Sequence, residues 1–231
     1  MITIVAHRGA PKQAHENTIK AFLAAVALGA DMVELDVRKT GDGILVVFHD
    51  PWLSRKTRSP HIADLTYKEL NKRAAQKKFS VPTLEETLRA LSGKIMLNIE
   101  LKEPGCEEEV VRHARKLFSL DKFIVTSFNP AIVDAVKSAD TKVTAGLICA
   151  TEKDLTECGK TAAEILAPEK KLFADQRRLF ADGKKQGKKI AVWTVDSTEH
   201  LSRLLVDPVV DAVITNRPDR ALSLRKKLCN N

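Results

Sequence analysis

Residues 31–50 read DMVELDVRKTGDGILVVFHD, and the opening DMVELDV alternates as a β-strand does. Glu34 and Asp36 share one face of this strand with Met32, whereas valine and leucine alone form the other face, because successive side chains point to opposite sides. An ordinary half-buried strand sends its carboxylates to water and its apolar residues to the core. Here the wholly apolar face needs a packing partner too, so we expect both faces to be covered.

The chain of 231 residues is long enough for a full hydrophobic core, and 44% of its residues are hydrophobic. No apolar run approaches the roughly 18 residues that a membrane span needs, so we expect a soluble protein without stable membrane insertion. The N-terminus, MITIVAHRGA, has no basic segment followed by a long apolar stretch and a cleavage site, which predicts a cytoplasmic location.

Short apolar runs alternate with amphipathic helical stretches such as NTIKAFLAAVALGA along the chain. Eight of these runs are candidate strands: 2–6, 31–37, 94–101, 122–128, 142–148, 162–167, 189–195 and 211–215. Alternation of strand and helix favours a parallel sheet, and eight such units favour a closed (β/α)8 TIM barrel. We therefore expect one barrel domain over residues 1–231. Its sixth unit is the least clear in the sequence, because the helix between Thr151 and Gly159 is short and the strand after it holds Glu164.

One segment breaks this rhythm. Between the second and third predicted strands, residues 44–93 hold an extra apolar run, ILVVF, and then more chain than one strand–helix unit needs. Long connections within a compact fold are commonly functional. We expect a small insertion at about residues 44–80 that forms a lid or rim at the barrel mouth rather than a separate domain.

The cysteines and the basic clusters carry no strong functional signal. The four cysteines, at 106, 149, 158 and 229, form no C-x-x-C pair and have no histidine at zinc-ligand spacing, so we expect reduced thiols. The formal charge of +8 includes KKQGKK and RKK clusters that lack interleaved aromatic residues. We expect solvated faces of outer helices and no nucleic-acid partner. A positive protein still attracts anionic small molecules.

In barrels of this type, the chemistry lies at the C-terminal ends of the strands. Several polar or aromatic residues fall at or directly after predicted strands, which would bring them to one rim: His7, Arg8, Glu34, Asp36, Glu100, Lys102, Ser127, Trp193, Thr194 and Asn216. Residues that are far apart in the sequence are thus predicted to converge on one site.

Three carboxylates of this group, Glu34, Asp36 and Glu100, are expected to meet at adjacent strand ends facing the barrel axis. Like charges so close repel unless protons or a cation intervene. Oxygen ligands without a thiolate or an obligatory imidazole favour a hard divalent ion, Mg²⁺ or Ca²⁺, over zinc. The competing interpretation is that the carboxylates pair with Arg8 and Lys102 as buried ions.

Two histidines approach this centre, His7 after the first strand and His49 at the end of the extra apolar run. A lone core histidine is usually a hydrogen-bonding residue, but two beside a metal and an arginine favour catalysis. Imidazole has a reference pKa near 6.5, so one histidine can act as base while the other protonates a leaving oxygen. Asp50 either orients His49 or serves the H-D-P turn.

Arg8 and Lys102 predict a phosphate-ester ligand, because a guanidinium suits phosphate oxygens and lysine acts as a point charge. A metal and positive side chains together would stabilise charge that develops on phosphoryl oxygens. Trp193 is either an aromatic wall for the alcohol portion or a core residue. Asn17 is expected to cap the first helix, which leaves Glu16 as a site residue or a helix-dipole partner.

Eight stretches, taken in order, resemble the pattern of the glycerophosphodiester phosphodiesterase family: AHRGA, HENTIKAF, GADMVELDVRKTGDGILVVFHD, VPTLEETL, NIELK, TSFNP, VWTVD and VDAVITNRP. The resemblance spans essentially the whole chain and is most specific in the first fifty residues. An H-R-G motif alone carries little weight, whereas H-R-G with E-N-T, E-x-D, H-D and E-x-K in order is a strong signature.

This resemblance implies a barrel enzyme that hydrolyses glycerophosphodiesters to an alcohol and sn-glycerol 3-phosphate. Carried over residue by residue, it makes His7 and His49 the acid/base pair and Arg8 and Lys102 the phosphate contacts. It makes the three carboxylates the metal ligands. In the mechanism usually drawn for such enzymes, a neighbouring glycerol hydroxyl attacks phosphorus and water then opens the cyclic phosphate. Direct attack by water is the open alternative.

Three positions depart from the usual pattern of the family. His15 stands where proline usually precedes E-N-T, Ala212 where glycine is common before the last strand, and Asn216 where aspartate is frequent. None of these changes removes a predicted ligand or base. The insertion is short beside those of secreted relatives, which agrees with a cytoplasmic form that acts on small, soluble diesters.

Two other functions stay open at this point. One is a lysophospholipase D-like phosphodiesterase on the same barrel, although the segment from Pro51 to Ser80 is basic and polar rather than apolar. The other is a non-catalytic barrel that binds phosphate esters, which the retention of both histidines and all three carboxylates disfavours. The sequence leaves open the alcohol head group, the choice between Mg²⁺ and Ca²⁺, and whether the protein forms a homodimer.

Overall fold

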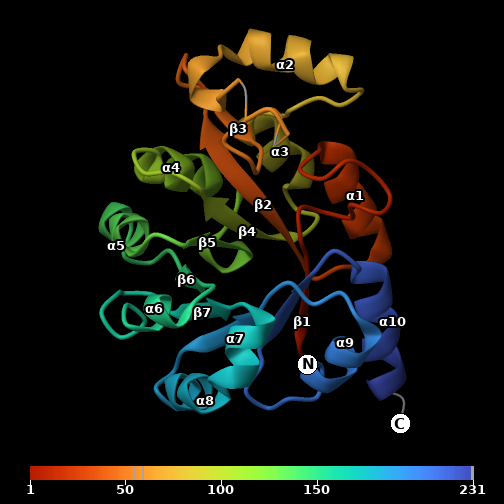
Figure 1. The fold of residues 1–231 in the computed structure, drawn as a ribbon, viewed down its shortest axis with the longest axis vertical. Helices are drawn as coiled ribbons and strands as arrows, with labels where there is room; N and C mark the ends of the chain where they lie inside the picture. The colour runs from red at the N-terminus through yellow and green to blue at the C-terminus, as the bar shows by residue number, and fades with distance from the viewer. Residues whose placement is uncertain (55, 59, 230–231) are drawn as a thin grey trace.

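In the computed structural model, which describes residues 1–54, 56–58 and 60–229, the strands form a closed barrel with helices around it (Figure 1). The parallel strands are β1 Thr3–Ala6, β2 Met32–Lys39, β4 Met96–Leu101, β5 Phe123–Ser127, β6 Ala145–Cys149, β7 Ile165–Pro168, β8 Lys189–Val192 and β9 Ala212–Thr215. β1 pairs with both β2 and β9, which closes the barrel. The predicted TIM-barrel fold and its eight strands are confirmed.

The two faces of β2 contribute side chains to two different apolar clusters. Its valine and leucine side chains are fully buried in the main hydrophobic core, which includes residues of the surrounding helices. Burying one such side chain stabilises the fold by about 1.5–3 kcal/mol. The alternate residue Met32 belongs to a separate apolar cluster with Val5 and Ile214. Both faces of β2 are therefore covered, as its sequence predicts.

Helices pack around the barrel between successive strands. They are α1 Ile19–Leu28, α3 Leu84–Leu91, α4 Glu107–Leu117, α5 Pro130–Ala139, α6 Glu152–Leu155, α7 Lys170–Asp175, α8 Arg177–Lys185, α9 Thr198–Leu204 and α10 Pro218–Cys229, with a 3-10 turn η2 at Leu120–Lys122. α3 shows the local signal clearly. A capping box of Thr83 and Glu86 starts it, and Leu84, Leu88 and Leu91 bury one face.

The sixth unit differs in detail from the prediction. α6 has only four residues, in line with the short helix expected there. The prediction that the strand at 162–167 holds Glu164 is wrong, because β7 begins at Ile165. The Glu164 carboxylate instead accepts a hydrogen bond from the backbone amide of Ala145 at 2.9 Å, so it stays at the bottom of the neighbouring strand pair.

The segment between β2 and α3 contains the predicted insertion. It holds β3 Leu45–Val47, which pairs antiparallel with the end of β2, then η1 Ile62–Asp64 and α2 Tyr67–Gln76. A small apolar cluster of its own stabilises it: Val46, Leu53, Ile62, Leu65, Leu70, Ala74 and Val81. In Figure 1 this segment lies at the top of the view, beside β2 and α3.

Two lysines of the KKQGKK cluster lie at the end of α8 and form ion pairs. Lys184 pairs with Asp211 at 2.9 Å, and Lys185 pairs with Asp182 at 2.9 Å. Within the described ranges, no helix combines the length and apolar character that a bilayer span requires. The thiols of residues 106, 149 and 158 are free, as predicted, whereas the side chain of Cys229 lies outside the described residues.

Candidate active site

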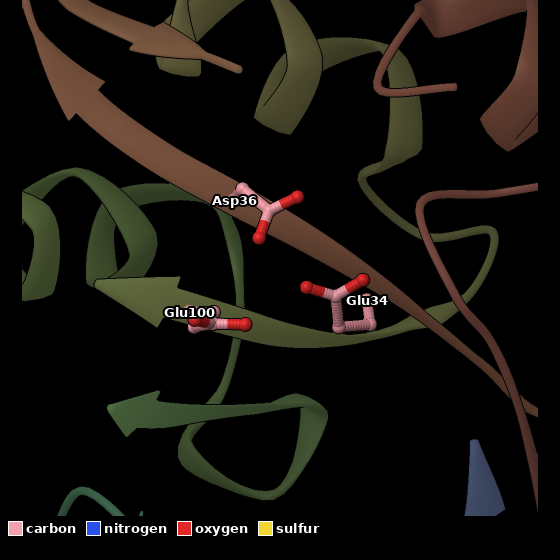
Figure 2. A group of neighbouring side chains, drawn as sticks. All are labelled: Glu34, Asp36 and Glu100. Atoms are coloured by element: carbon pink, nitrogen blue, oxygen red, sulfur yellow. The ribbon is translucent and has the colours of Figure 1, made fainter. Parts of the chain in front are cut away.

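Three buried carboxylates meet where β2 and β4 run side by side. Asp36 and Glu100 are direct partners in the pairing of these strands, and Glu34 lies two residues earlier on β2. Glu34, Asp36 and Glu100 are 2%, 0% and 6% exposed. One oxygen from each lies within 4.8 Å of the others, and Figure 2 shows the carboxylates directed toward one common space. The predicted convergence is therefore present.

Burial disfavours the ionised form of Glu34 and Glu100 when no cation is bound. Burial, with Asp36 and Glu100 close by, raises the pKa of Glu34 well above its usual value. Oε1 of Glu34 is buried and has no hydrogen-bond donor among the residues that the structure describes. Burial also raises the pKa of Glu100 to about 7. The cluster therefore retains protons near neutral pH unless a cation replaces them.

Two cationic side chains partly compensate these carboxylates. Arg8 Nε lies 3.2 Å from Asp36 Oδ2, Lys102 Nζ lies 2.8 Å from Asp36 Oδ1, and Lys102 also contacts Glu100 closely. Burial opposes ionisation of Asp36, but Lys102 and Arg8 lower its pKa overall. Two positive groups cannot balance three ionised carboxylates, so the cluster must hold either a proton or a further cation. Its oxygen donors and the unsatisfied Glu34 oxygen fit a hard divalent ion.

Both predicted histidines line a cavity of 140 Å³ together with Glu34. His7 Nε2 lies 3.9 Å from Glu34 Oε2, and His49 Nδ1 lies 2.7 Å from Asp50 Oδ1, so Asp50 does contact the ring that it could orient. Burial and the nearby Arg8 lower the pKa of His7 to about 4, and burial lowers the pKa of His49. Both imidazoles are therefore mainly neutral at pH 7 before a ligand binds.

A chain of hydrogen bonds fixes the tautomer of His7. His7 Nδ1 lies 2.9 Å from Asn216 Oδ1, and Asn216 Nδ2 donates to Asp196 Oδ2 at 2.8 Å. An ionised carboxylate can only accept, so Asn216 must present its NH₂ to Asp196 and its oxygen to His7. Nδ1 of His7 then carries the proton. Nε2, the nitrogen that approaches Glu34, is left with a lone pair toward the carboxylate cluster.

Asn17 does not cap the first helix, so that expectation is wrong. Thr18 is the N-cap of α1, and its side chain accepts a backbone amide of the first turn. Asn17 has a left-handed backbone with φ of 57°, which asparagine tolerates, and its Nδ2 donates to Asp36 Oδ2 at 2.6 Å. Glu16 accepts a hydrogen bond from Arg8 Nη1 at 2.9 Å, which places it beside the cluster rather than over the helix dipole.

Trp193 packs against the apolar cluster of Val5, Met32 and Ile214 and also lines the 140 Å³ cavity. Its Nε1 donates to the Ala167 carbonyl at 2.7 Å, and its ring meets Phe128 edge to face with centroids 5.5 Å apart. Phe128 in turn lies 5.8 Å from Lys102 Nζ. Both rings line the 140 Å³ cavity, where they form an apolar wall beside its charged residues.

His49 also lines a second cavity, of 330 Å³, which reaches the insertion. Glu16, Phe48 and Phe79 are among its other walls. The ring of His15 stacks on Phe79 with centroids 4.1 Å apart. His49 therefore stands between a small inner cavity beside the carboxylates and a larger outer cavity beside the insertion.

Two residues near the site, Asp196 and Phe128, were not among the site residues predicted from the sequence. Asp196 follows β8 within VWTVD, and Phe128 follows β5 within TSFNP. Each comes directly after a strand or a few residues later, so its place in a barrel was the available signal. Asp196 contacts Asn216, which in turn contacts His7. Asp196 and Asn216 lie in separate loops, so no short sequence motif contains both.

Comparison with known proteins shows which proteins this chain is similar to. A family model described as the glycerophosphoryl diester phosphodiesterase family matches residues 7–220. A glycerophosphodiester phosphodiesterase from Caldanaerobacter subterraneus subsp. tengcongensis is 33% identical over 97% of this chain and 98% of that protein. A protein of the same name from Bacillus altitudinis is 32% identical over 99% of this chain and 100% of that protein.

Solved structures show the same similarity. A glycerophosphodiester phosphodiesterase from Thermotoga maritima superposes with a TM-score of 0.84 at 27% identity, covering 97% of this chain and 99% of that one. A phosphodiesterase from Oleispira antarctica, in complex with the product sn-glycerol-3-phosphate, superposes with a TM-score of 0.83 at 27% identity. That match covers 97% of this chain and 96% of the other.

Proposed function

Because the chain belongs to the glycerophosphoryl diester phosphodiesterase family, we propose that it hydrolyses glycerophosphodiesters to an alcohol and sn-glycerol 3-phosphate. The chain is an enzyme of this class, and the proposal concerns how its own residues work. The observation that supports it best is the meeting of three buried carboxylates, two cationic side chains and two histidines around one 140 Å³ cavity.

Glu34, Asp36 and Glu100 would hold one Mg²⁺ or Ca²⁺ ion. Their oxygen-only donor set and the unsatisfied Glu34 Oε1 support this assignment. When bound, such an ion polarises phosphoryl oxygens and stabilises the charge that they develop. Binding of the ion also satisfies carboxylates that Arg8 and Lys102 now neutralise. Those two side chains are then available to contact the phosphate oxygens.

His7 is the general base in this proposal. Its Nδ1 proton is held by Asn216, so Nε2 can accept a proton from the attacking group. A pKa of about 4, set by burial and Arg8, keeps the ring neutral and ready to accept. The attacking group is either a hydroxyl of the glycerol arm or a water molecule. Phosphorus NMR of a single turnover distinguishes them, because only the hydroxyl route passes through a cyclic phosphate.

His49 is the general acid, because it stands between the two cavities. A diester whose phosphate lies beside Arg8 and Lys102 would place its glycerol arm in the 140 Å³ cavity and its alcohol arm in the 330 Å³ cavity. Burial and these two cations lower the pKa of His49 in the free protein. A bound anionic phosphate acts against the positive charges of Arg8, Lys102 and the divalent ion, and so favours the protonated ring that the leaving oxygen needs.

The size of the inner cavity favours a glycerol arm without an acyl chain. Its volume, 140 Å³, is less than half of the 330 Å³ of the outer cavity. Trp193 and Phe128 wall this space. A lysophospholipase D-like reaction would have to fit a long acyl chain on the same glycerol, so hydrolysis of acyl-free glycerophosphodiesters is the preferred assignment over that alternative.

The proposed function has a direct test. Purified protein with Mg²⁺ or Ca²⁺ should release sn-glycerol 3-phosphate from glycerophosphocholine or glycerophosphoethanolamine, and a chelator should abolish the release. Lysophosphatidylcholine should be turned over far more slowly. If no divalent ion supports release of glycerol 3-phosphate from any head group, the barrel is a phosphate-ester binding protein instead.

We further propose that the enzyme works in the cytoplasm on small diesters, within glycerol and lipid metabolism. Its free thiols agree with a reducing compartment. A homodimer is the oligomeric state to test, and light scattering during gel filtration separates it from a monomer. Assays with a panel of head groups and ions will identify the preferred alcohol and metal.

A further inference from the structure

Two cysteines lie in contact away from the candidate active site. Cys149 ends β6, and Cys158 lies in the turn that follows α6. Their sulfur atoms are 3.5 Å apart, and the two residues are 0% and 6% exposed. A thiol pair in contact has a chemical outcome that a single buried thiol lacks, because one sulfur can trap an oxidised form of the other.

Solvent reaches the two sulfur atoms unequally. Cys158 lines a cavity of 670 Å³ between α6 and α8, together with Leu155, Gly159 and Lys188. Cys149 does not line this cavity and is completely buried. A small polar reagent that enters the cavity therefore meets Cys158 first and finds Cys149 behind it.

The electrostatics of the pair support the same order of reaction. The hydrogen bond between the two thiols lowers the pKa of Cys158, against the effect of burial. Lys188 acts in the same direction, while Asp154 and Glu157 oppose it. The same hydrogen bond raises the pKa of Cys149. Cys158 is thus the better nucleophile, and Cys149 keeps its proton.

We propose that Cys158 and Cys149 form an oxidative modification site for small hydroperoxides. The Cys158 thiolate attacks one peroxide oxygen, the O–O bond breaks, and hydroxide leaves, which gives a sulfenic acid at Cys158. The Cys149 sulfur then displaces the sulfenic hydroxyl, loses its proton and forms a disulfide. With hydrogen peroxide, two thiols and one peroxide become one disulfide and two water molecules.

The local fold allows this bond to form. A disulfide bond is about 2.05 Å long, so the sulfur atoms must approach by about 1.5 Å from 3.5 Å. Cys149 is held in the barrel by β6, whereas Cys158 lies in a turn after a four-residue helix. The turn is the part that can move. The disulfide would fasten this connection to the end of β6, on the catalytic side of the barrel.

Cys106 provides a matched comparison within the same chain. It is similarly buried, at 2% exposed, and its thiol donates to the carbonyl of Glu103, as the Cys158 thiol does to the carbonyl of Asp154. The difference is the second thiol, which lies 3.5 Å from Cys158. Burial raises the pKa of Cys106 to about 12. The proposal therefore predicts that Cys106 reacts at least tenfold more slowly with peroxide than Cys158 does.

Mass spectrometry of the folded wild-type protein after hydrogen peroxide treatment tests the proposal. We expect the loss of two hydrogen atoms, a cross-linked peptide that joins residues 149 and 158, and reversal by dithiothreitol. Cys149→Ser should instead accumulate a sulfenic acid at Cys158 that dimedone labels, Cys158→Ser should form neither product, and Cys106→Ser should behave as wild type.

The wild-type peptide map is decisive even if a variant fails to fold. A cross-link to Cys229 or between chains, sulfinic acid at Cys158 without a disulfide, or oxidation of Cys106 at the same rate would overturn the proposal. Because the reaction needs neither substrate nor metal, its failure leaves the phosphodiesterase assignment untouched.

Discussion

Along one face of β2, the barrel interior changes from packing to chemistry within a few residues. Met32 lies with Val5 and Ile214 in an apolar cluster, here called the barrel floor, whereas Glu34 and Asp36 are buried among like charges at the barrel mouth. Burial favours apolar side chains and penalises carboxylates. The apolar side chains of the floor therefore stabilise the fold. The buried carboxylates of the mouth lower the stability of the fold, but they provide a binding site.

Removing a carboxylate from the mouth should have the largest effect on activity. In Glu34→Ala, we expect kcat/KM to fall by about 10³-fold and cation affinity to fall with it, because a ligand to the ion is lost. The melting temperature in chelator should not fall, since a costly buried group has been removed. A coupled assay for glycerol 3-phosphate, calorimetric titration and thermal melts measure these quantities. Unchanged cation affinity would show that Glu34 is not a ligand.

The histidines at the mouth should affect turnover without affecting the ion. His7→Ala and His49→Ala should each lower kcat by about 10²-fold or more, while cation affinity stays near the wild-type value. His113 on α4, which lies 3.9 Å from Glu109, provides the control, and His113→Ala should leave turnover unchanged. Loss of cation affinity in both active-site variants would make the histidines ligands rather than acid and base.

The link from Asn216 to His7 should have a smaller effect. Asn216→Leu removes the acceptor that keeps the proton on His7 Nδ1, so we expect kcat to fall by about tenfold with little change in KM. Asp196→Asn should act in the same direction but less strongly, because Asn216 stays and loses only its fixed orientation. NMR of the ring nitrogens of His7 reports the tautomer. If the tautomer and kcat are both unchanged in Asn216→Leu, Asn216 does not hold the proton on His7 Nδ1.

A substitution in the floor should reverse the pattern. Met32→Ala opens a cavity in the apolar cluster and should lower the free energy of unfolding by about 2–5 kcal/mol. Below its melting transition, the variant should keep cation affinity, and kcat should stay within about twofold of wild type. Denaturant unfolding and the coupled assay measure both. A large loss of activity in the folded variant would show that floor and mouth are not separable.

Much of this division could be predicted from the sequence. The alternation of β2 places Glu34 and Asp36 on one face, and the order of strands brings Glu100 beside them, so the cluster follows from pattern and barrel topology. Asn17 could not be predicted, because its left-handed backbone and its contact with Asp36 depend on the assembled barrel. The contact of Asp196 with Asn216 could not be predicted either, because the two residues lie in separate loops and no short sequence motif contains both.

The central claim is that three carboxylates at the mouth hold a divalent ion in place of protons. The pKa of Glu100 is raised to about 7 from an ordinary value of 4.5, so between these values the folded state binds more protons than the unfolded state. The contribution of Glu100 to stability in chelator should therefore be greatest below pH 4.5. It should be lost as the pH rises through 7. An ion that replaces the protons should remove this loss.

Thermal melts of the wild type from pH 6.5 to 8, with chelator and with Mg²⁺ or Ca²⁺, test this most directly, because below pH 6.5 the lowered pKa of His7 makes stability rise with pH. We expect the melting temperature in chelator to decrease toward pH 8, and the ion to raise it there by about 5 °C or more. Glu34→Ala should lose most of this rise. An ion that changes the melting temperature at no pH, or that stabilises Glu34→Ala equally, would contradict the account.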